Sequence, residues 1–377
     1  MMTHAQTHIH VVSFDVPFPP TYGGVIDVFY KIKALHAKGV KVHLHCFQYG
    51  RERASQLEEL CESVMYYPRN VSRAQLFTRL PYIVISRNSE ALLQELAKDN
   101  HPIIFEGLHT CGILDDPLLE GRFKIVRTHN VESDYYRSLA KVERNVFKRY
   151  YFHNEAGKLE AFEPVLAKAD AVAAISRNDT LYFDKKYKNA FYIPAFHSNE
   201  KVQITPGRGK FALYHGNLAV GENNEAALFL VNKVFTDTEI PLMIAGSRPS
   251  KELQMAVAKK NHVTLLSDLS TKQIHQLISD AHVNILPTFQ PTGIKLKLLS
   301  ALYNGRFALV NAPMVENTGL EQLCIVSDDA TGMREMLNAL MERDFTEDDI
   351  ALREKTLRES FSNDINVQKL INLFGNR

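Results

Sequence analysis

The sequence carries no surplus of positive charge, and this absence argues against nucleic acid as a partner. Lysine and arginine total 44 and aspartate and glutamate total 43, so the formal net charge over 377 residues is +1. Proteins that bind nucleic acid generally carry a basic surplus, because neutralised phosphates supply their affinity. We therefore expect no nucleic-acid partner, although a local basic patch is not excluded by the net charge.

Cysteine is scarce, and long apolar runs are missing. The four cysteines have spacings that match no zinc or redox pattern, and their scatter is typical of buried thiols in a reducing compartment. No stretch approaches the ~18 apolar residues that a membrane-spanning helix needs, and the polar, histidine-rich residues 1–10 do not resemble a signal peptide. We expect a cytoplasmic protein that can still touch a membrane surface. The cysteines are Cys46, Cys61, Cys111 and Cys324.

Several motifs with a defined chemistry are also absent. The chain has neither a G-x-G-x-x-G nor a P-loop sequence, so the usual dinucleotide and P-loop phosphate cradles are missing. It has no G-x-S-x-G nucleophile elbow and no H-E-x-x-H zinc motif. No D-x-D pair occurs, which argues against enzymes that hold a sugar nucleotide through a metal ion clamped by two aspartates. We predict no metal site.

What the sequence does contain is an alternation of short apolar strands and helices. Residues 9–14 form a strand-like run, a glycine-containing loop follows, and apolar positions from Val25 to Leu35 fall on one helical face. Gly39 then ends the helix and residues 40–47 form the next strand-like run. Because parallel strands need crossover helices, this pattern predicts a mostly parallel sheet covered on both faces. Further strands of this half are expected at residues 103–106, 124–128 and 171–175.

The alternation stops at residues 194–210 and then begins again. This segment contains proline and glycine with little apolar periodicity, which is typical of an interdomain linker. The sequence predicts an α/β protein of two doubly wound, Rossmann-like domains, residues 1–195 and 196–359, facing a central cleft that is the default ligand site. The strands of the second half are expected at residues 211–215, 242–245, 263–266, 283–286, 307–310 and 323–326, before a helical tail at 346–374.

The most informative motif is the segment from Pro291 to Leu302, which follows a predicted strand and opens a helix. Free amide N–H groups and a partial positive charge at a helix N-terminus attract anions. Lys295 and Lys297 add cations against the helix dipole, which favours a bound polyanion such as a diphosphate, and Gly293 lets the backbone approach it. A solvated lysine pair on an ordinary amphipathic helix explains the residues equally well.

Two other loops join a strand to a helix through small residues. Gly23 and Gly24 in the segment P-F-P-P-T-Y-G-G-V permit close approach by a phosphate or a sugar, the alternative being a tight turn that merely needs glycine. Gly216 and Asn217 occupy the matching position in the second half. Turn and capping roles are an equally good explanation for that pair.

Polar side chains follow two adjacent predicted strands of the first half. Glu106 and His109 lie at the end of one strand, and His129 and Glu132 follow the next. Groups at the carboxyl ends of such strands face a cleft, where they can bind hydroxyls or shuttle protons. A lone histidine is usually structural, but two polar clusters at neighbouring strand ends make a functional role an even alternative.

In their order along the chain, these segments resemble the GT-B-fold glycosyltransferases, and specifically glycosyltransferase family 4. The resemblance covers nearly the whole length, although no single motif is decisive. The similar segments are the P-x-P-P-x-x-G-G-V loop, Glu106-Gly107, residues 127–132 (similar to H-N-x-E), Gly216-Asn217-Leu218 with Asn224-Glu225-Ala226, residues 242–246, and residues 292–302 (similar to G-T-R-L-K-x-L-E-A-M).

The resemblance implies a retaining, metal-independent transfer of a sugar from a nucleoside-diphosphate donor to a glycan or lipid-linked acceptor, without a cofactor. It implies an intracellular enzyme that builds a bacterial surface polysaccharide or related glycoconjugate. The last helix, about residues 360–377, would cross back to the first domain. The implied catalytic residues are His109 and Glu106, with His129 and Glu132 on the acceptor side. The implied donor-binding residues are Gly23, Gly24, Gly216, Asn217, Thr292, Gly293, Lys295, Lys297 and Ser300.

Ser300 departs from the family pattern. The family carries a glutamate there that holds the ribose hydroxyls, whereas serine cannot accept hydrogen bonds from both hydroxyls of a diol as a carboxylate does. The loop after Gly216 also lacks the basic residue that many members carry. Two alternatives to a transferase follow. One is a degenerate member that binds or scaffolds without catalysis, and the other is a sugar-nucleotide epimerase, which fits the motif order less well.

One basic, aromatic helix suggests contact with lipid. Phe147, Tyr150, Tyr151 and Phe152 lie among five cations, and such a stretch can rest on anionic lipid. This predicts a peripheral location at the inner face of the membrane. A solvated helix that packs its aromatics on the first domain is the alternative. The cations are Lys141, Arg144, Lys148, Arg149 and Lys158.

Overall fold

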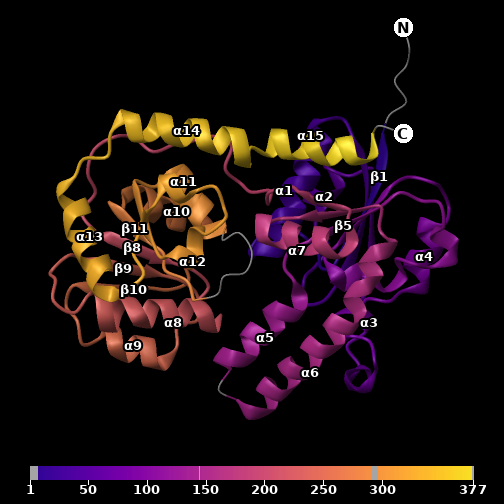
Figure 1. Cartoon of the computed structure of the whole chain (residues 1–377), viewed down its shortest axis with the longest axis horizontal. Coiled ribbons are helices and arrows are strands. Elements are labelled where there is room, and N and C mark those ends of the chain that lie inside the picture. The colour runs from indigo at the N-terminus through magenta and orange to yellow at the C-terminus, as the bar shows by residue number, and fades with distance from the viewer. Residues whose placement is uncertain (1–6, 144, 290–295, 376–377) are drawn as a thin grey trace, which may run out of the picture. The chain divides into compact units, whose positions relative to one another are not determined.

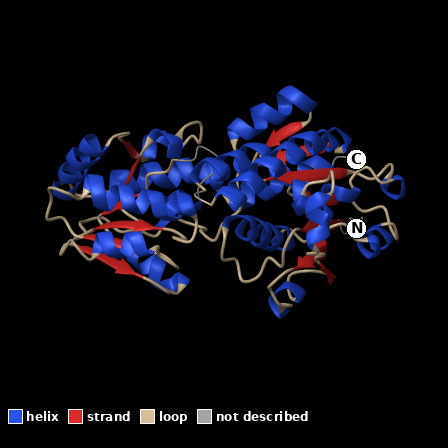
Figure 2. Ribbon diagram, turned by 90° about the horizontal axis from the view of Figure 1, so that it is seen from below, coloured by secondary structure: helices blue, strands red, loops and turns tan. Residues whose placement is uncertain are grey.

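A computed structural model of the chain describes residues 7–143, 145–289 and 296–375. The chain divides into two compact units. The first comprises residues 1–198 together with 361–377, and the second comprises residues 199–360. In each unit a parallel sheet lies between helices (Figures 1 and 2). The predicted doubly wound α/β architecture is therefore confirmed in both units.

The first unit contains a seven-stranded parallel sheet in the order β3-β2-β1-β4-β5-β6-β7. The edge strands β3 and β7 were not predicted from the sequence, because an edge strand has one neighbour and carries a weaker apolar pattern. The strands are β1 His8–Ser13, β2 Lys41–Gln48, β3 Ser63–Pro68, β4 Ile103–Glu106, β5 Lys124–Thr128, β6 Ala171–Ala174 and β7 Ala190–Tyr192. The helices are α1 Gly23–Ala37, α2 Ser55–Glu58, α3 Tyr82–Ile85, α4 Glu90–Leu96, α5 Glu132–Val142, α6 Val146–Phe162, α7 Arg177–Tyr187 and α15 Asn363–Phe374.

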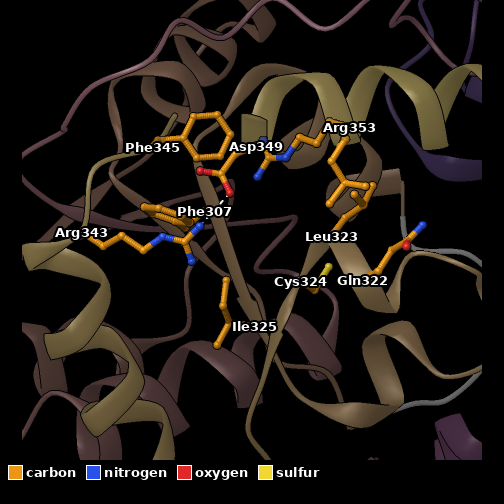
Figure 3. A pocket seen from close by; sticks show the side chains of 10 residues that line it. Phe307, Gln322, Leu323, Cys324, Ile325, Arg343, Phe345, Asp349 and Arg353 are labelled. Atoms are coloured by element: carbon orange, nitrogen blue, oxygen red, sulfur yellow. Dashed lines mark hydrogen bonds and ion pairs between the residues drawn. The ribbon is translucent and has the colours of Figure 1, made fainter. Parts of the chain in front are cut away.

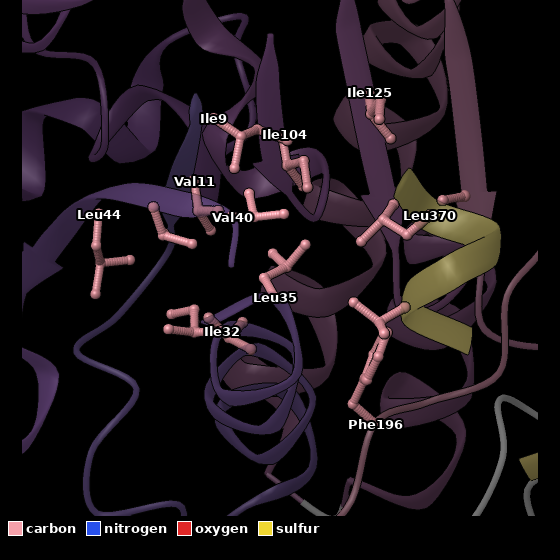
Figure 4. Close-up of a cluster of buried hydrophobic side chains, with 14 of the residues drawn as sticks. Ile9, Val11, Ile32, Leu35, Val40, Leu44, Ile104, Ile125, Phe196 and Leu370 are labelled. Atoms are coloured by element: carbon pink, nitrogen blue, oxygen red, sulfur yellow. The ribbon is translucent and has the colours of Figure 1, made fainter. Parts of the chain in front are cut away.

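The last helix, α15, is part of the core of the first unit. Leu370 packs into the apolar cluster that joins β1 to α1, together with Ile9, Ile32 and Leu35 (Figure 4). Burying a leucine of this kind contributes about 1.5–3 kcal/mol. The C-terminal helix is therefore held by the same hydrophobic contacts as the first β–α unit, although it is far from that unit in sequence.

The second unit contains a six-stranded parallel sheet in the order β10-β9-β8-β11-β12-β13. Its strands are β8 Ala212–His215, β9 Leu242–Ala245, β10 Val263–Leu266, β11 Val283–Ile285, β12 Phe307–Val310 and β13 Ile325–Val326. Its helices are α8 Gly221–Phe229, α9 Lys251–Val257, α10 Thr271–Asp280, α11 Leu296–Asn304, α12 Ala312–Val315, α13 Ala330–Glu342 and α14 Glu347–Phe361, the last of which ends at the boundary with the first unit.

Strand order reverses once in each sheet, and this defines where a ligand can bind. In the first sheet β1 lies between β2 and β4, and in the second sheet β8 lies between β9 and β11. The loops that follow the two strands at such a reversal diverge and leave a crevice beyond the carboxyl ends of the strands. Those predicted site residues that the structure describes follow β1, β4 and β5 in one unit and β8 and β11 in the other, which brings them to these two edges.

Among the residues that the structure describes, no helix is long and apolar enough to span a bilayer.

Cys46 and Cys111 are buried, and all four cysteines are free thiols.

A line of histidines crosses one face of the first sheet near its amino edge. His10 Nδ1 lies 2.8 Å from His45 Nε2, and His45 Nδ1 lies 2.9 Å from the hydroxyl of Tyr67. Both histidines are buried, and burial lowers the pKa of His10 to about 4 and that of His45 to about 3. They are therefore neutral at pH 7 in the folded chain.

We predict that these two histidines make the fold sensitive to acid. In the unfolded chain each has a pKa near 6.5, so below this value the unfolded state binds more protons than the folded state. The free energy of unfolding then falls as the pH falls from 6.5 toward 4, by up to about 1.4 kcal/mol per pH unit for each histidine. Urea unfolding at pH 7 and at pH 5 measures the loss.

A double variant, His10→Gln with His45→Gln, should lose much of this pH dependence even if it is less stable at pH 7. The exposed His153→Gln on α6 is the matched control and should keep the full slope. An unchanged slope in the double variant would show that the acid sensitivity comes from other groups.

Candidate functional site

In the second unit, the loop after β8 packs tightly against the end of β9. The backbone N–H of Gly216 donates to the carbonyl of Ala245 (3.0 Å). A Cβ on Gly246 would lie 2.0 Å from the carbonyl oxygen of Gly216, so a side chain cannot be accommodated there. Asn217 is exposed and accepts a hydrogen bond through Oδ1 from Ser247 Oγ (3.2 Å). Gly216 and Asn217 thus lie in one closely packed loop at the carboxyl edge.

Lys297, the second residue of α11, reaches toward β8 and α8. Its Nζ donates to Asn223 Oδ1 (2.6 Å) and lies 5.3 Å from the centre of the Tyr214 ring, a cation–π contact. Beside it, burial and then the charge of Lys297 lower the pKa of His215 to about 3, and within the described part of the chain His215 Nε2 has no hydrogen-bond partner. This edge therefore has a half-buried ammonium group next to a buried, neutral imidazole whose Nε2 lacks a partner among the described residues.

A buried carboxylate that the sequence analysis did not single out lies at the same edge. Glu222, in the first turn of α8, accepts a hydrogen bond from Thr288 Oγ1. The backbone N–H of Thr288 in turn donates to Asn311 Oδ1 (2.9 Å). The network joins the start of α8 to the ends of β11 and β12. The signal that could have revealed Glu222 is an acid in the first helical turn after the Gly216 loop, where the helix dipole favours it.

Only part of the predicted lysine motif can be located. Thr292, Gly293 and Lys295 lie outside the described residues. Ser300 is partly buried on α11, three residues after Lys297, so the two side chains share one face of the helix.

In the first unit, α1 begins at Gly23 without an acidic side chain in its first turn. A Cβ on Gly24 would lie 2.6 Å from Cζ of Phe14, whereas a Cβ on Gly23 would have no neighbour within 4 Å. A side chain at position 24 would therefore displace the ring of Phe14. Gly23 leaves open space at a helix N-terminus, where free N–H groups attract anions.

A buried ionic cluster connects α1 with the ends of β4 and β5. Arg127 donates to Asp27 through Nε (3.0 Å) and Nη2 (2.8 Å). Lys31 Nζ forms ion pairs with both Asp27 and Glu106. His129 Nε2 lies 3.3 Å from Asp27 Oδ2 and 3.5 Å from Glu106 Oε2. The structure thus brings the predicted residues Glu106 and His129 together. Asp27 and Lys31 were missed, although an acid and a base four residues apart on an otherwise apolar helix face could have indicated them.

The charges of this cluster are compensated within it. Burial alone would raise the pKa of Asp27, but Arg127 and Lys31 hold it well below its usual range. Burial would lower the pKa of His129, but its hydrogen bonds to Asp27 and Glu106 raise it. Asp27, Glu106 and His129 have the ligand types of a metal site. Two permanent cations already balance the two carboxylates, so a dication would add uncompensated buried charge.

His109 differs from Glu106 in its surroundings. Glu106 is completely buried, whereas His109 is partly exposed. The His109 ring lies 5.2 Å from that of Phe14, and its Nδ1 has no hydrogen-bond partner among the residues described. Burial, then the charges of Arg87 and His129, hold the pKa of His109 well below its usual value. His109 is therefore a neutral imidazole with an unused nitrogen.

Glu132, the first residue of α5, is a buried carboxyl group with a strongly raised pKa. Burial raises its pKa to about 7; His129 and Arg87 oppose this rise, and the carboxylate of Asp179 adds to it. Asp179, near the start of α7, has its own pKa raised to about 6, chiefly by burial. At pH 7 Glu132 exists in both protonation states, so it can donate or accept a proton.

Two cavities lie at different ends of the sheets. One, of about 300 Å³, is lined by Phe307 and Arg343 (Figure 3). Because Phe307 is the first residue of β12, this cavity lies at the amino edge of the second sheet, away from the reversal of strand order. The other, of about 580 Å³, lies in the first unit between the loops after β1 and β2 and is lined by Phe18, Arg51 and Arg53. It therefore lies at the carboxyl edge.

Sequence comparisons point to one family. Residues 209–343, within the second unit, match the model of the family described as glycosyl transferases group 1. An uncharacterized 44.6 kDa protein in the cps region of Klebsiella pneumoniae is 27% identical over 355 residues, which cover 88% of this chain and 90% of the relative.

Solved structures share the fold over the full length. TarM superposes with a TM-score of 0.69 at 11% identity and covers 100% of both chains. HepE of Anabaena, in complex with UDP and glucose, gives a TM-score of 0.67 at 11% identity and covers 98% of this chain and 99% of its own. A glycosyltransferase from Rickettsia africae gives a TM-score of 0.63 at 12% identity and covers 99% of this chain and 100% of its own. The chain therefore has the Rossmann-like fold of the GT-B glycosyltransferases, and its residues 209–343 form a glycosyl transferases group 1 domain.

Proposed function

We propose that the protein is a retaining, metal-independent glycosyltransferase that moves a sugar from a nucleoside-diphosphate donor to a glycan or lipid-linked acceptor. The observation that carries this proposal is the group 1 domain at residues 209–343, together with Lys297 and its neighbours at the carboxyl edge of that domain's sheet. HepE, which has the same fold, is in complex with UDP-glucose. We take UDP as the first nucleotide to test.

The second unit supplies the donor site in this proposal. As the glycosidic bond breaks, negative charge develops on the departing diphosphate, and preorganised cations and N–H groups stabilise it. Lys297 supplies the cation, and Lys295 is a second by its position in the sequence. Gly216 and Asn217 approach the nucleotide through the loop after β8, and Thr292, Gly293 and Ser300 belong to the same site by sequence.

The first unit supplies the acceptor side and one donor contact. His109 is proposed to meet the substrate through its partly exposed ring, whose buried Nδ1 has no hydrogen-bond partner among the described residues. The completely buried, ion-paired Glu106 acts instead as a positioning residue that orients His129. Glu132 accepts a hydrogen bond or a proton from an acceptor hydroxyl. Gly23 and Gly24, at the N-terminus of α1, are proposed as further donor-binding residues.

The acceptor is proposed to be a growing surface polysaccharide or its lipid-linked precursor. The relative in the cps (capsule) region of Klebsiella pneumoniae supports this class. In the first unit, the cavity of about 580 Å³, which is lined by Arg51, Glu52 and Arg53, is large enough for part of a sugar chain. An intracellular enzyme of this kind would work on carriers anchored in the membrane.

We predict that Lys297→Ala weakens the binding of UDP by about 10–100-fold. A charge-assisted hydrogen bond contributes about 1.5–3 kcal/mol, and the variant removes the donor. Isothermal titration of the full chain with UDP and UDP-glucose measures the affinity, and a thermal-shift panel of other nucleoside diphosphates identifies the base if UDP is not the ligand.

Two variants serve as controls for this titration. Lys272→Ala removes an exposed lysine on α10 and should bind UDP as tightly as the unchanged chain. His109→Ala should lower sugar transfer while retaining most of the UDP affinity. If no nucleoside diphosphate binds at millimolar concentration, the proposed function is wrong.

A binding protein without transferase activity is the second candidate, and Ser300 favours it. A serine at this place lacks the second acceptor oxygen that a ribose diol needs. The function of the protein would then be to bind the donor without turning it over. Such a protein would still bind a diphosphate through Lys297.

The variant Ser300→Glu separates the two candidates. If the chain is an enzyme, the added carboxylate should tighten binding of the nucleoside diphosphate by about tenfold, because two hydrogen bonds to a charged group replace one, and should increase a measurable basal hydrolysis of UDP-glucose. Ser300→Gln, of similar size but uncharged, is the control. Tighter binding without any turnover in either chain would support the binding protein.

We also propose that the pair of helices α5 and α6 rests on an anionic membrane surface. The two helices lie side by side and extend away from the sheet of the first unit (Figure 1). At their tip Phe147 is 87% exposed and Tyr150 is 74% exposed, next to exposed Val142 and Val146. Tyr151 and Phe152 are partly buried, and the Phe152 ring packs edge-on against Tyr136.

The exposed apolar tip is surrounded by cations. Lys141, Lys148 and Arg149 are exposed, whereas Arg144 lies outside the described residues. Lys158, the fifth predicted cation, does not belong to this surface, because its Nζ donates to the carbonyl of Leu76 and pairs with Glu155. Peripheral proteins usually attach to a membrane by inserting apolar side chains into its surface, while neighbouring lysine and arginine side chains contact anionic lipid.

We predict that Lys148→Glu combined with Arg149→Glu weakens binding to anionic vesicles by at least about 30-fold, since each cation near such a surface contributes about 1 kcal/mol. Phe147→Ser with Tyr150→Ser should weaken binding to the same vesicles at high salt as well. Co-sedimentation with vesicles that contain phosphatidylglycerol measures both. The exposed Leu181→Ser on α7 is the control. Equal binding of all variants would refute the membrane contact.

A further inference from the structure

Three histidines from separate segments meet at the amino edge of the first sheet. His8 begins β1, His43 lies on β2 and His101 lies two residues before the start of β4, and β1 is the strand between the other two. The ring centres are 5.2 Å apart for His8 and His43, 4.9 Å for His8 and His101, and 5.9 Å for His43 and His101. One nitrogen from each ring lies within 4.8 Å of the other two.

The spacing of these nitrogens is close to that of metal ligands. His8 Nδ1 lies 3.0 Å from His43 Nε2. Two nitrogens that are each about 2.0–2.1 Å from one zinc ion lie about 3.3 Å apart at the tetrahedral angle. The first pair is therefore close to this spacing, and a His101 nitrogen lies within 4.8 Å of both.

Neighbouring groups hold two of the three histidines in this arrangement. His43 Nδ1 lies 2.9 Å from Ser63 Oγ. A hydrogen bond from the non-ligating nitrogen to an oxygen is the usual support of a metal-bound histidine, and it leaves Nε2 as the ligand. The backbone of His101 is fixed on both sides, because its N–H donates to Asp99 Oδ1 (2.9 Å) and its carbonyl accepts from Arg122 Nε (2.9 Å).

The next histidines along the face are already engaged. His10 contacts His45 through one nitrogen and Asp99 through the other, and His45 also contacts Tyr67. Both are buried, whereas His8, His43 and His101 are partly exposed, so an ion from solvent can reach these three. Unlike Asp27, Glu106 and His129, the triad has no lysine or arginine ion-paired to its ligand atoms among the described contacts.

We propose that His8, His43 and His101 bind one divalent transition-metal ion of the zinc class. Three imidazole ligands favour zinc, copper or nickel over magnesium and calcium, which prefer oxygen. Three protein ligands leave a fourth position for water. The ion ties β1 and β2 to the segment that begins β4, and it lies at the opposite end of β1 from the candidate site of the same unit. The sequence contained no metal motif, because the three ligands come from segments far apart in the chain.

Zinc titration of the full chain tests this proposal. The protein is prepared without a histidine tag, stripped with a chelator, and titrated with Zn²⁺ in competition with a chromogenic chelator of known affinity. We expect one tight equivalent and a rise in melting temperature. His101→Ala should weaken zinc binding by at least about tenfold, the size of effect that even an outer-shell substitution produces.

His101→Ala is the cleanest variant, because among the described residues this ring makes no side-chain hydrogen bond, and an unchanged melting temperature in chelator shows that the variant folds. His8→Ala should weaken zinc binding similarly, whereas the exposed His153→Ala should not. With Co²⁺ as the probe, the unchanged chain should show the visible absorption of a nitrogen-ligated, four-coordinate ion. No tight equivalent, equal binding by His101→Ala, or loss of binding on His129→Ala instead would each overturn the site.

Discussion

The buried pair of Asp27 and Arg127 is the interaction on which the candidate site of the first unit depends. Arg127 donates to both carboxylate oxygens of Asp27 and to the carbonyls of Ile193 and Pro194, and the backbone N–H of Phe196 donates to Asp27 as well. One ion pair thus connects α1, β5 and the segment after β7. Removing one partner from such a pair costs about 3–5 kcal/mol, because the other charge remains buried. It also sets the charge around His129 and, through Lys31, fixes Glu106. Glu106 and His129 are therefore positioned by buried ionic groups from α1 and β5.

Both units have a strand reversal beside their first strand, but the charged side chains at the two edges differ. Each sheet reverses its strand order beside its first strand, and each places a glycine-containing loop and a helix N-terminus at that edge. In the first unit the charges at this edge are buried and compensate one another. In the second unit the Lys297 ammonium group donates to Asn223 and to the Tyr214 hydroxyl at this edge.

The two edges of the first sheet also differ in chemistry. Acids, arginine and a neutral histidine gather at the carboxyl edge, whereas histidines gather at the amino edge. Alternate residues of a strand share a face, so His8 and His10 on β1 and His43 and His45 on β2 form one line across neighbouring strands. The inner pair is sealed by the apolar core and stays neutral. The outer pair, with His101, remains open to solvent, and this exposure separates a structural hydrogen-bond chain from a ligand set.

The sequence by itself determined the fold class, because the alternation of short apolar strands and helices permits few arrangements other than doubly wound sheets, and parallel strands bring every strand-end loop to one edge. It also located His109, His129 and Lys297 at such loops. It could not reveal β3 and β7, whose half-buried edge positions weaken the apolar pattern, nor the pairing of Asp27 with Arg127, 100 residues apart. Glu106 shows the limit most clearly. Its place at the end of a strand suggested a group that could bind hydroxyls or shuttle protons, and only the tertiary structure decided that it is buried and ion-paired with Lys31, because the partners of a buried group come from segments that the chain brings together in space.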